Sequence, residues 1–243
     1  MISSTDTFAE LTHPAASATT KHVRRILFLA AFFGWVKHAM ARTVKTRLLG
    51  FSLGIPPTVF HPRFYLTSRF LGEYIGTLAL NNKRVLDIGC GSGILSLASA
   101  RSGGTVVALD VNPAAVQATI ENALRNQLSS KICAIQSDLF AGLEHPAEAF
   151  DLLVCNPPFY EGEPHSIADS AFRGGSHHLF MTNFARSCAR FLSPHGCILL
   201  VLSSDADVKA CLLPFHKNGF KSRVVKVERH FFETLGLIEL RGQ

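Results

Sequence analysis

A glycine-rich turn between an apolar strand and a helix constrains the fold of this chain most. Residues 83–93 read K-R-V-L-D-I-G-C-G-S-G, and residues 94–98 continue in a helical pattern. Glycines at Gly89, Gly91 and Gly93 let the backbone approach a ligand closely and leave helix amides directed at it. The turn therefore predicts a ligand site at the carboxyl end of a buried strand.

The spacing of this turn separates two classes of ligand. Dinucleotide sites use G-x-G-x-x-G, whereas this chain has G-x-G-x-G with Asp87 two positions before the first glycine. An acid there suits an ammonium group better than a pyrophosphate. Cys90 lies inside the turn without a neighbouring histidine or cysteine in the sequence, so we interpret it as a small filling residue.

Two further strands end in carboxylates. The run 105–109 leads to Asp110, whose oxygens can accept both hydroxyls of a ribose, as NAD and S-adenosylmethionine (SAM) sites require. The run 132–135 leads to Asp138, which can accept from an adenine amino group. Strands alternating with helices predict an α/β fold, a doubly wound, Rossmann-like and mostly parallel sheet, with ligands beyond the carboxyl ends of its strands.

A fourth apolar run, 150–155, ends in Asn156-Pro157-Pro158-Phe159. Prolines cannot continue a hydrogen-bonded strand, so the strand stops there. The tetrapeptide offers a side-chain amide oxygen, a prolyl carbonyl and a flat ring. Two acceptors and a ring fit a planar NH2 group, so this motif indicates chemistry on an amide or amino nitrogen.

These motifs carry a family resemblance. In order, D-I-G-C-G-S-G, A-L-D-V-N-P, S-D-L-F and N-P-P-F resemble the class I SAM-dependent methyltransferases, and most closely the HemK-type protein-glutamine N5-methyltransferases of the small archaeal and eukaryotic branch. The resemblance covers about residues 56–242 and includes Gly174-Gly175. It implies a seven-stranded sheet with an antiparallel last strand. The chain lacks the acid that family members often carry before the position of Thr67, so a contact between Thr67 or Ser68 and SAM is left open.

The resemblance also implies an activity and a set of site residues. SAM would be converted to S-adenosylhomocysteine as a methyl group passes to a nitrogen, with no metal. A glutamine of a protein such as a translation release factor is the expected acceptor. An adenine or guanine base is the alternative, because base methyltransferases share N-P-P-F, and a SAM-binding subunit without activity is a third reading. The expected catalytic residues are Asn156, Pro157, Pro158 and Phe159, and the expected cofactor-binding residues are Asp87, Gly89, Cys90, Gly91, Gly93, Asp110, Asp138 and Asn156.

Charge divides the chain into two parts. Residues 1–83 hold ten Lys and Arg against three acids, whereas residues 84–243 hold fourteen against fifteen. We expect a mobile terminus over 1–20, a basic hydrophobic helical extension over 21–55 and the SAM-dependent domain over 56–243. The apolar run 26–36 rises only about 16 Å as a helix, about half of a membrane's hydrocarbon core. Contact of residues 21–50 with a membrane surface, with a partner, or with the enzyme's own core stays open, and so does a cleaved signal peptide.

Cysteine and histidine usage bears on compartment and metal. The six cysteines form no C-x-x-C pair, which indicates free thiols in a reducing compartment and a cytoplasmic protein, with membrane association left open. His177-His178 is the most metal-like pair, but adjacent residues do not share a helix face. We therefore expect no metal site.

Overall fold

The computed structural model describes residues 42–62, 66–143, 149–166, 169–230 and 233–242. Its strands and helices, in chain order, are β1 (Val44–Leu48), β2 (Phe51–Ile55), α3 (Leu66–Ile75), β3 (Arg84–Ile88), α4 (Ile94–Arg101), β4 (Thr105–Asp110), α5 (Pro113–Arg125), β5 (Ile132–Gln136), β6 (Phe150–Cys155), α6 (Leu179–Ser187), β7 (Leu192–Ser203), α7 (Val208–Lys217), β8 (Phe220–Arg229) and β9 (Thr234–Gly242).

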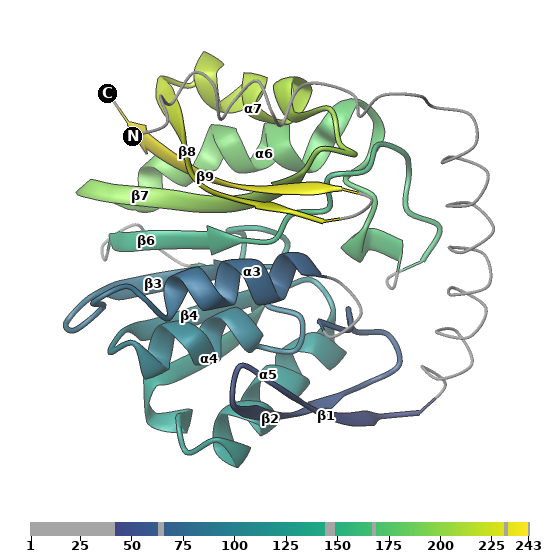
Figure 1. Cartoon of the computed structure of the whole chain (residues 1–243), viewed down its shortest axis with the longest axis vertical. Coiled ribbons are helices and arrows are strands. Elements are labelled where there is room, and N and C mark those ends of the chain that lie inside the picture. Colours follow the sequence, from purple (N-terminus) through teal and green to yellow (C-terminus); the bar gives the residue numbers. More distant parts are fainter. Residues whose placement is uncertain (1–41, 63–65, 144–148, 167–168, 231–232, 243) are drawn as a thin grey trace.

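A seven-stranded sheet runs through the domain in the order β5-β4-β3-β6-β7-β9-β8. Strands β3 to β7 pair in parallel, and β9 is antiparallel to both β7 and β8. The predicted doubly wound sheet with an antiparallel last strand is confirmed. The parallel strands point to the right in Figure 1, so their carboxyl ends meet at one edge of the sheet.

Buried side chains alternate between two cores, one on each face of the sheet. In β6, Leu153 and Cys155 join the core under α6 and α7, whereas Leu152 and Val154 join the core under α3 and α4. A strand covered on both faces has no solvent side, which is why its sequence is continuously apolar. Figure 1 shows the two helical layers on either side of the strands.

The described part of the N-terminal extension is a hairpin, so the helix predicted up to residue 55 is wrong there. Strands β1 and β2 pair antiparallel, and the turn residues Leu49 and Gly50 have φ of 52° and 79°. Two positive φ values in a two-residue loop match the twist of a hairpin. The exposure of β1 alternates residue by residue, a strand pattern that the basic charge of the segment obscured. Residues 1–41 lie outside the described residues.

The hairpin is part of the core of the domain. Phe51, Leu53 and Ile55 are at most 3% exposed and pack into the core under α3 and α4. Helix α6 begins only at Leu179, because His177 and His178 both have φ of 53°, outside the helical region. Strand β7 begins at Leu192, with a register shift opposite Phe150.

Candidate active site

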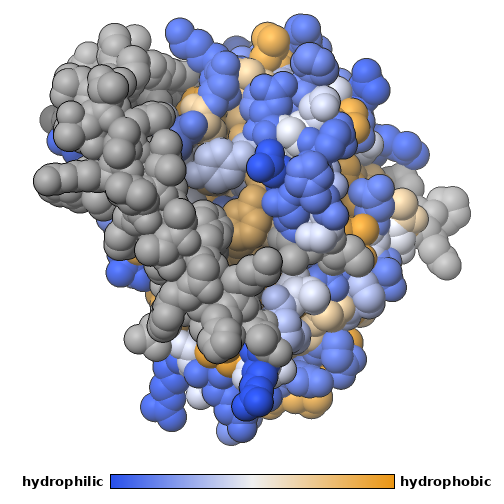
Figure 2. All heavy atoms as spheres, turned by 90° about the vertical axis from the view of Figure 1, so that its right-hand side faces the viewer, coloured by the Kyte–Doolittle hydropathy of each residue, from blue (hydrophilic) through white to orange (hydrophobic). Residues whose placement is uncertain are grey.

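A cavity of about 350 Å³ lies beyond the carboxyl ends of the central strands. This edge faces the viewer in Figure 2, where hydrophilic and apolar surfaces are interspersed. The expected site residues that line it are Gly89, Cys90, Gly91, Asp110, Asp138, Asn156 and Pro158. Asp87, Gly93, Pro157 and Phe159 are not among its lining residues.

The three glycines of the turn have two different roles. All have positive φ (74°, 55° and 79°), a conformation that favours glycine. A Cβ at Gly89 or Gly91 would meet nothing within 4 Å, so these two face open space. A Cβ at Gly93 would lie 2.9 Å from Thr119 Oγ1. Gly93 therefore allows α4 to pack closely on α5, while Gly89 and Gly91 leave room for a ligand.

Most backbone amides of this turn are already used within the protein. The N–H groups of Gly89 and Cys90 donate to the Leu109 carbonyl at 2.8 and 2.9 Å. The Gly91 N–H donates to Asp110 Oδ2 at 2.8 Å, and the Gly93 N–H donates to the Cys90 carbonyl. The expectation that the turn directs its amides at a ligand is wrong for these four. A pyrophosphate site needs such amides free. The arrangement therefore agrees with the glycine spacing, which also argued against a dinucleotide ligand.

Asp110 is held by its own backbone surroundings. Its Oδ2 accepts from Gly91 N–H and its Oδ1 accepts from Asn112 N–H at 2.9 Å. Burial raises the pKa of Asp110, and these two hydrogen bonds oppose that rise. A carboxylate has about four acceptor positions. Asp110 therefore keeps a fixed orientation with acceptor capacity left for a ribose.

Asp87 lies behind the turn rather than on the cavity wall. It is fully buried, and its Oδ2 accepts from Ser96 Oγ at 2.5 Å. Its Oδ1 is buried and without a hydrogen-bond partner among the described residues. Burial raises the pKa of Asp87 to about 7, and the neighbouring Asp110 adds to the rise. Asp87 therefore does not contact the cavity directly, and its unpartnered acid oxygen stays buried two residues before Gly89.

Asp138 and Cys90 are the other two residues that the sequence predicts to bind the cofactor. Asp138 is exposed and lines the cavity after β5, beside buried Ser137. Cys90 is 4% exposed, and Thr119 Oγ1 donates to its Sγ at 3.3 Å. Burial raises the pKa of the Cys90 thiol well above its usual value. The thiol therefore stays protonated, which agrees with its interpretation as a filling residue.

The Asn156 side chain is oriented by a neighbour that the motif alone does not reveal. Its Nδ2 donates to Ser68 Oγ at 3.0 Å, and both residues line the cavity. Because the amide nitrogen is engaged by Ser68, its oxygen is the group left to accept a hydrogen bond. Ser68 comes from α3, the helix whose role at the site the sequence left open.

The remainder of the motif divides between the cavity and the core. Pro157 is buried, Pro158 lines the cavity, and Phe159 packs against the core under α6 and α7. Phe159 also contacts Tyr160 with ring centroids 4.9 Å apart. The structure does not bring the Phe159 ring to the cavity as the motif suggested.

Gly174 supports the motif from the following loop. A Cβ on Gly174 would lie 2.4 Å from the Pro158 carbonyl oxygen, closer than any side chain allows. Its N–H donates to the Tyr160 carbonyl at 2.9 Å, and Phe180 N–H donates to the Gly174 carbonyl. Close packing against Pro158 thus explains the first glycine of the pair Gly174-Gly175.

Several lining residues were missed from the sequence. They are Thr58, Phe60, Asn112, Glu163, Arg173, Phe180 and Asn183. Only Asn112 carried a signal, since it precedes Pro113 as a helix cap and accepts from Ala114 N–H at 3.0 Å. Its Nδ2 donates to the Thr58 carbonyl, which fixes the segment after the hairpin against the site.

Two further features of the described residues concern metal ligands and membrane-spanning helices. Within them, no group of three or more His, Cys, Asp or Glu side chains could hold a metal ion. Among the same residues, no helix is both long and apolar enough to cross a membrane.

Comparison with known proteins places this site in a family. Residues 57–231 match the methyltransferase small domain. The chain is 32% identical over 165 residues to a putative protein N5-glutamine methyltransferase of Methanocaldococcus jannaschii, covering 65% of this chain and 81% of that protein. It covers only 35% of matched ribosomal protein L11 methyltransferases from Leptospira interrogans.

Two solved structures share the fold. The 16S rRNA N2 G1207 methyltransferase (RsmC) of T. thermophilus, in complex with AdoMet and guanosine, has a TM-score of 0.60 at 24% identity and covers 83% of this chain and 50% of that chain. The E. cuniculi Mtq2–Trm112 complex, responsible for methylation of the eRF1 translation termination factor, has a TM-score of 0.57 at 20% identity, covering 76% of this chain and 99% of that chain. At these identities the likeness is one of fold.

Proposed function

The chain belongs to the methyltransferase small domain family and is a SAM-dependent methyltransferase. We propose that it methylates a planar amide or amino nitrogen, and that the favoured acceptor is a glutamine side chain of a protein. The observation that carries the proposal is the orientation of Asn156. Its Nδ2 is engaged by Ser68, so Oδ1 is the atom available for an N–H of the acceptor.

The cofactor side fits SAM. Gly89 and Gly91 leave open space, Asp110 has acceptor capacity for the ribose hydroxyls, and Asp138 is available for the adenine amino group. Acids around the cavity suit the positive charges of SAM, which lie on its sulfonium and its ammonium group. Bound SAM supplies an electrophilic methyl group, so no other activation of the donor is needed.

The residues of the chain act mainly on the acceptor. Asn156 Oδ1, at the cavity, accepts one N–H hydrogen, and we assign the other to the carbonyl oxygen of Pro157, the buried residue between the lining residues Asn156 and Pro158. The two hydrogen bonds direct the nitrogen lone pair toward the methyl group. No described backbone N–H donates to the Pro157 carbonyl. A C–N bond forms as the C–S bond breaks, and the same oxygens stabilise positive charge that grows on nitrogen. The surplus proton leaves the nitrogen for water after transfer, so the chemistry requires no dedicated base.

A protein acceptor is supported by the M. jannaschii relative, a putative protein N5-glutamine methyltransferase. A translation release factor is supported by the Mtq2–Trm112 complex, which is responsible for methylation of a translation termination factor. A nucleic-acid base is the second candidate, because the RsmC neighbour acts on a guanine N2. An exocyclic amino group would use the same two acceptors.

Methyl transfer from labelled SAM into a methylation-deficient lysate tests the proposal. We expect the label to be released by protease and to resist nuclease, and acid hydrolysis to yield labelled methylamine from N5-methylglutamine. Asn156→Ala is the control and should leave the lysate unlabelled. Label released by nuclease would contradict a protein acceptor and favour the base.

A further inference from the structure

The β1–β2 hairpin is fixed to α5 by two asparagines one helical turn apart. Asn122 Oδ1 accepts from Gly54 N–H at 2.8 Å, and its Nδ2 donates to the Gly54 carbonyl at 3.0 Å. Asn126 makes the same pair of bonds to Ser52, both at 2.9 Å. The two side chains thus satisfy the backbone groups along the free edge of β2. The hairpin has a defined position on the helix.

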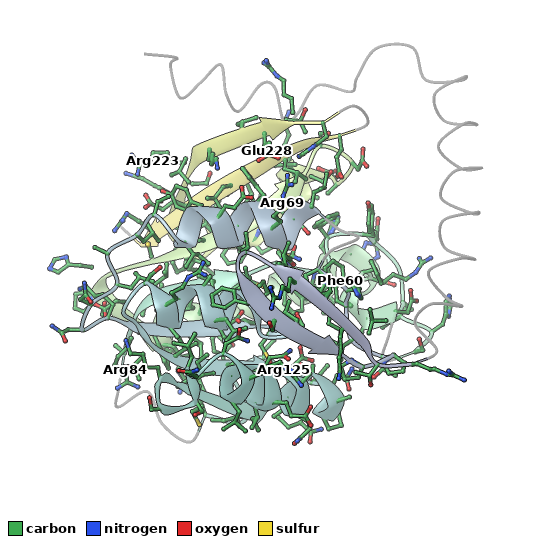
Figure 3. The ribbon with its side chains drawn as sticks, turned by 60° about the horizontal axis from the view of Figure 1, so that its bottom comes forward. Phe60, Arg69, Arg84, Arg125, Arg223 and Glu228 are labelled. Carbon is green, nitrogen blue, oxygen red and sulfur yellow. The ribbon has the colours of Figure 1, made fainter. Side chains whose placement is uncertain are left out.

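This arrangement brings Arg125 onto the strand. A Cβ at Gly54 would lie 3.2 Å from Arg125 Nη1 and 3.4 Å from Nη2, so the guanidinium packs closely on this glycine and would have to shift to admit a side chain. Arg125 Nη1 also donates to Asn122 Oδ1. Figure 3 shows Arg125 beside the hairpin.

Three cations converge around a second cavity, of about 430 Å³. Lys45 and Arg47 come from one face of β1 and Arg125 from α5, and the remaining lining residues are Thr46, Ser52 and Leu53. Within the described residues, none of the three cations has a carboxylate within 4.0 Å. Glu121, one turn before Arg125, accepts instead from Gln117 Nε2 at 3.0 Å. Cations gathered without counter-charge create a positive potential that favours an anion.

We propose that this cavity binds the phosphate backbone of an RNA strand. Lys, Arg and hydroxyl side chains are the groups that contact phosphate oxygens. A lipid surface fits less well, because the large apolar side chains of the hairpin strand, Phe51, Leu53 and Ile55, are buried. Insertion into a membrane interface would need such side chains exposed.

The position of the cavity relative to the methyl-transfer site supports a polymer. Asn112 caps the start of α5 at the site, and Arg125 ends the same helix at the basic cavity. Thirteen residues give α5 a length of about 20 Å, or about six steps of a stacked strand at about 3.4 Å each. An RNA bound at the basic cavity is therefore long enough to reach the methyl-transfer site. A protein bound to that RNA could reach the site in the same way. The inference holds whichever nitrogen is methylated.

Binding of a fluorescein-labelled 20-nucleotide single-stranded RNA, followed by anisotropy between 50 and 200 mM NaCl, tests the proposal. The full-length variant Lys45→Gln/Arg47→Gln should bind at least tenfold more weakly. Its slope of log K against log salt should fall by about 1.4, or about 0.7 for each lost phosphate contact. The matched control is Lys209→Gln/Lys217→Gln on α7, which removes two exposed lysines far from the hairpin and should bind within twofold of the unaltered protein.

A charge-neutral variant separates geometry from net charge. Gly54→Ala places a methyl group against Arg125 and should weaken RNA binding several-fold. SAM affinity, measured for every variant, reports that the fold is intact. If the two double variants lost RNA affinity equally, or if neither lost RNA affinity, the proposal would be overturned. The proposal would also be overturned if Lys45→Gln/Arg47→Gln lost binding to anionic phospholipid vesicles but kept its RNA affinity. That result would assign the cavity to a lipid headgroup.

Discussion

The cofactor side and the acceptor side of the active site are built differently. On the cofactor side, the Asp110 carboxylate accepts from the Gly91 and Asn112 N–H groups, and the Leu109 carbonyl accepts from two N–H groups of the glycine turn. On the acceptor side, residues 156–178 contain no regular helix or strand in their described part. Two isolated bridges, Tyr160↔Arg173 and Gly162↔Gly175, and short 3-10 turns hold that loop.

The difference indicates a division of labour. The methyl donor is the same molecule in every reaction of this class, so its site can be part of the rigid sheet. An acceptor loop with few buried apolar contacts can change its sequence without disturbing the sheet. That is consistent with protein and RNA methyltransferases appearing among the similar proteins.

The largest effect should come from the cofactor side. Asp110→Ala removes the acceptor for Gly91 N–H, Asn112 N–H and the ribose hydroxyls, and each unpaired polar group costs about 1–3 kcal/mol. SAM affinity in calorimetry should fall at least ~1,000-fold. Exposed Asp138→Ala is the control and should lose at most about tenfold. Unaltered affinity in Asp110→Ala would remove that residue from the site.

Asn156→Ala should separate the two sides most clearly. SAM affinity should stay within several-fold, while kcat falls about 10²–10³-fold, as for other single positioned polar groups. Ser68→Ala leaves Asn156 present but without its hydrogen-bond partner, so kcat should fall about tenfold with little change in SAM affinity. Turnover of Asn156→Ala within threefold of the unaltered protein would contradict the proposed role of the motif.

Gly174→Ala tests whether the acceptor loop needs close packing. The added Cβ must displace the Pro158 carbonyl, from which it would be 2.4 Å away. A displacement of about 1 Å at a reacting group can lower the reaction rate about 10²-fold. We therefore expect kcat to fall about 10–100-fold while SAM affinity stays unchanged. Gly242→Ala meets nothing within 4 Å and serves as the control. Steady-state kinetics with separate SAM titration distinguishes the outcomes.

Asn122 and Asn126 form a matched pair for the cofactor turn. Both hold the hairpin, but only Asn122 also donates to the Ser92 carbonyl, at 2.9 Å. Asn122→Ala should weaken SAM binding about 3–10-fold, whereas Asn126→Ala should leave it unchanged, because one neutral hydrogen bond contributes about 1 kcal/mol. Both variants should lower Tm. Equal SAM affinities would mean that the hairpin and the turn are uncoupled.

The smallest effect is a pH dependence of the ligand-free protein. Asp87 has a pKa of about 7 when folded, well above the ordinary 3.8. Its contribution to stability is therefore full below about pH 4 and is lost as pH rises through about 7. Relative to Asp87→Asn, the free energy of unfolding should fall by about 0.5–1 kcal/mol per pH unit between about pH 5 and 7. Urea denaturation at several pH values measures this, and a rise with pH would show that Asp87 is ionised.

Local patterns were sufficient where a function depends on neighbours in the chain. The turn at Gly89 to Gly93, the carboxylate Asp110 after its strand and the cap at Asn112 each follow from a few consecutive residues. Strand and helix alternation predicted a mostly parallel sheet covered by helices, because parallel strands need long crossover connections, which are usually helical. These features needed no knowledge of distant residues.

Distant contacts decided the rest. Ser68 contacts Asn156 across 88 positions of sequence, and Asn122 contacts Gly54 across 68. The packing of Phe159 against the core and the burial of Asp87 behind the turn depend on how the layers pack, which no local motif encodes. The sequence by itself determined the fold class, because strand and helix periodicity is local, and it indicated the methyl donor through the motifs that resemble those of the class I methyltransferases. Only the tertiary structure decided which side chains face the cavity, because burial and hydrogen bonding at each position are set by residues far away in the chain.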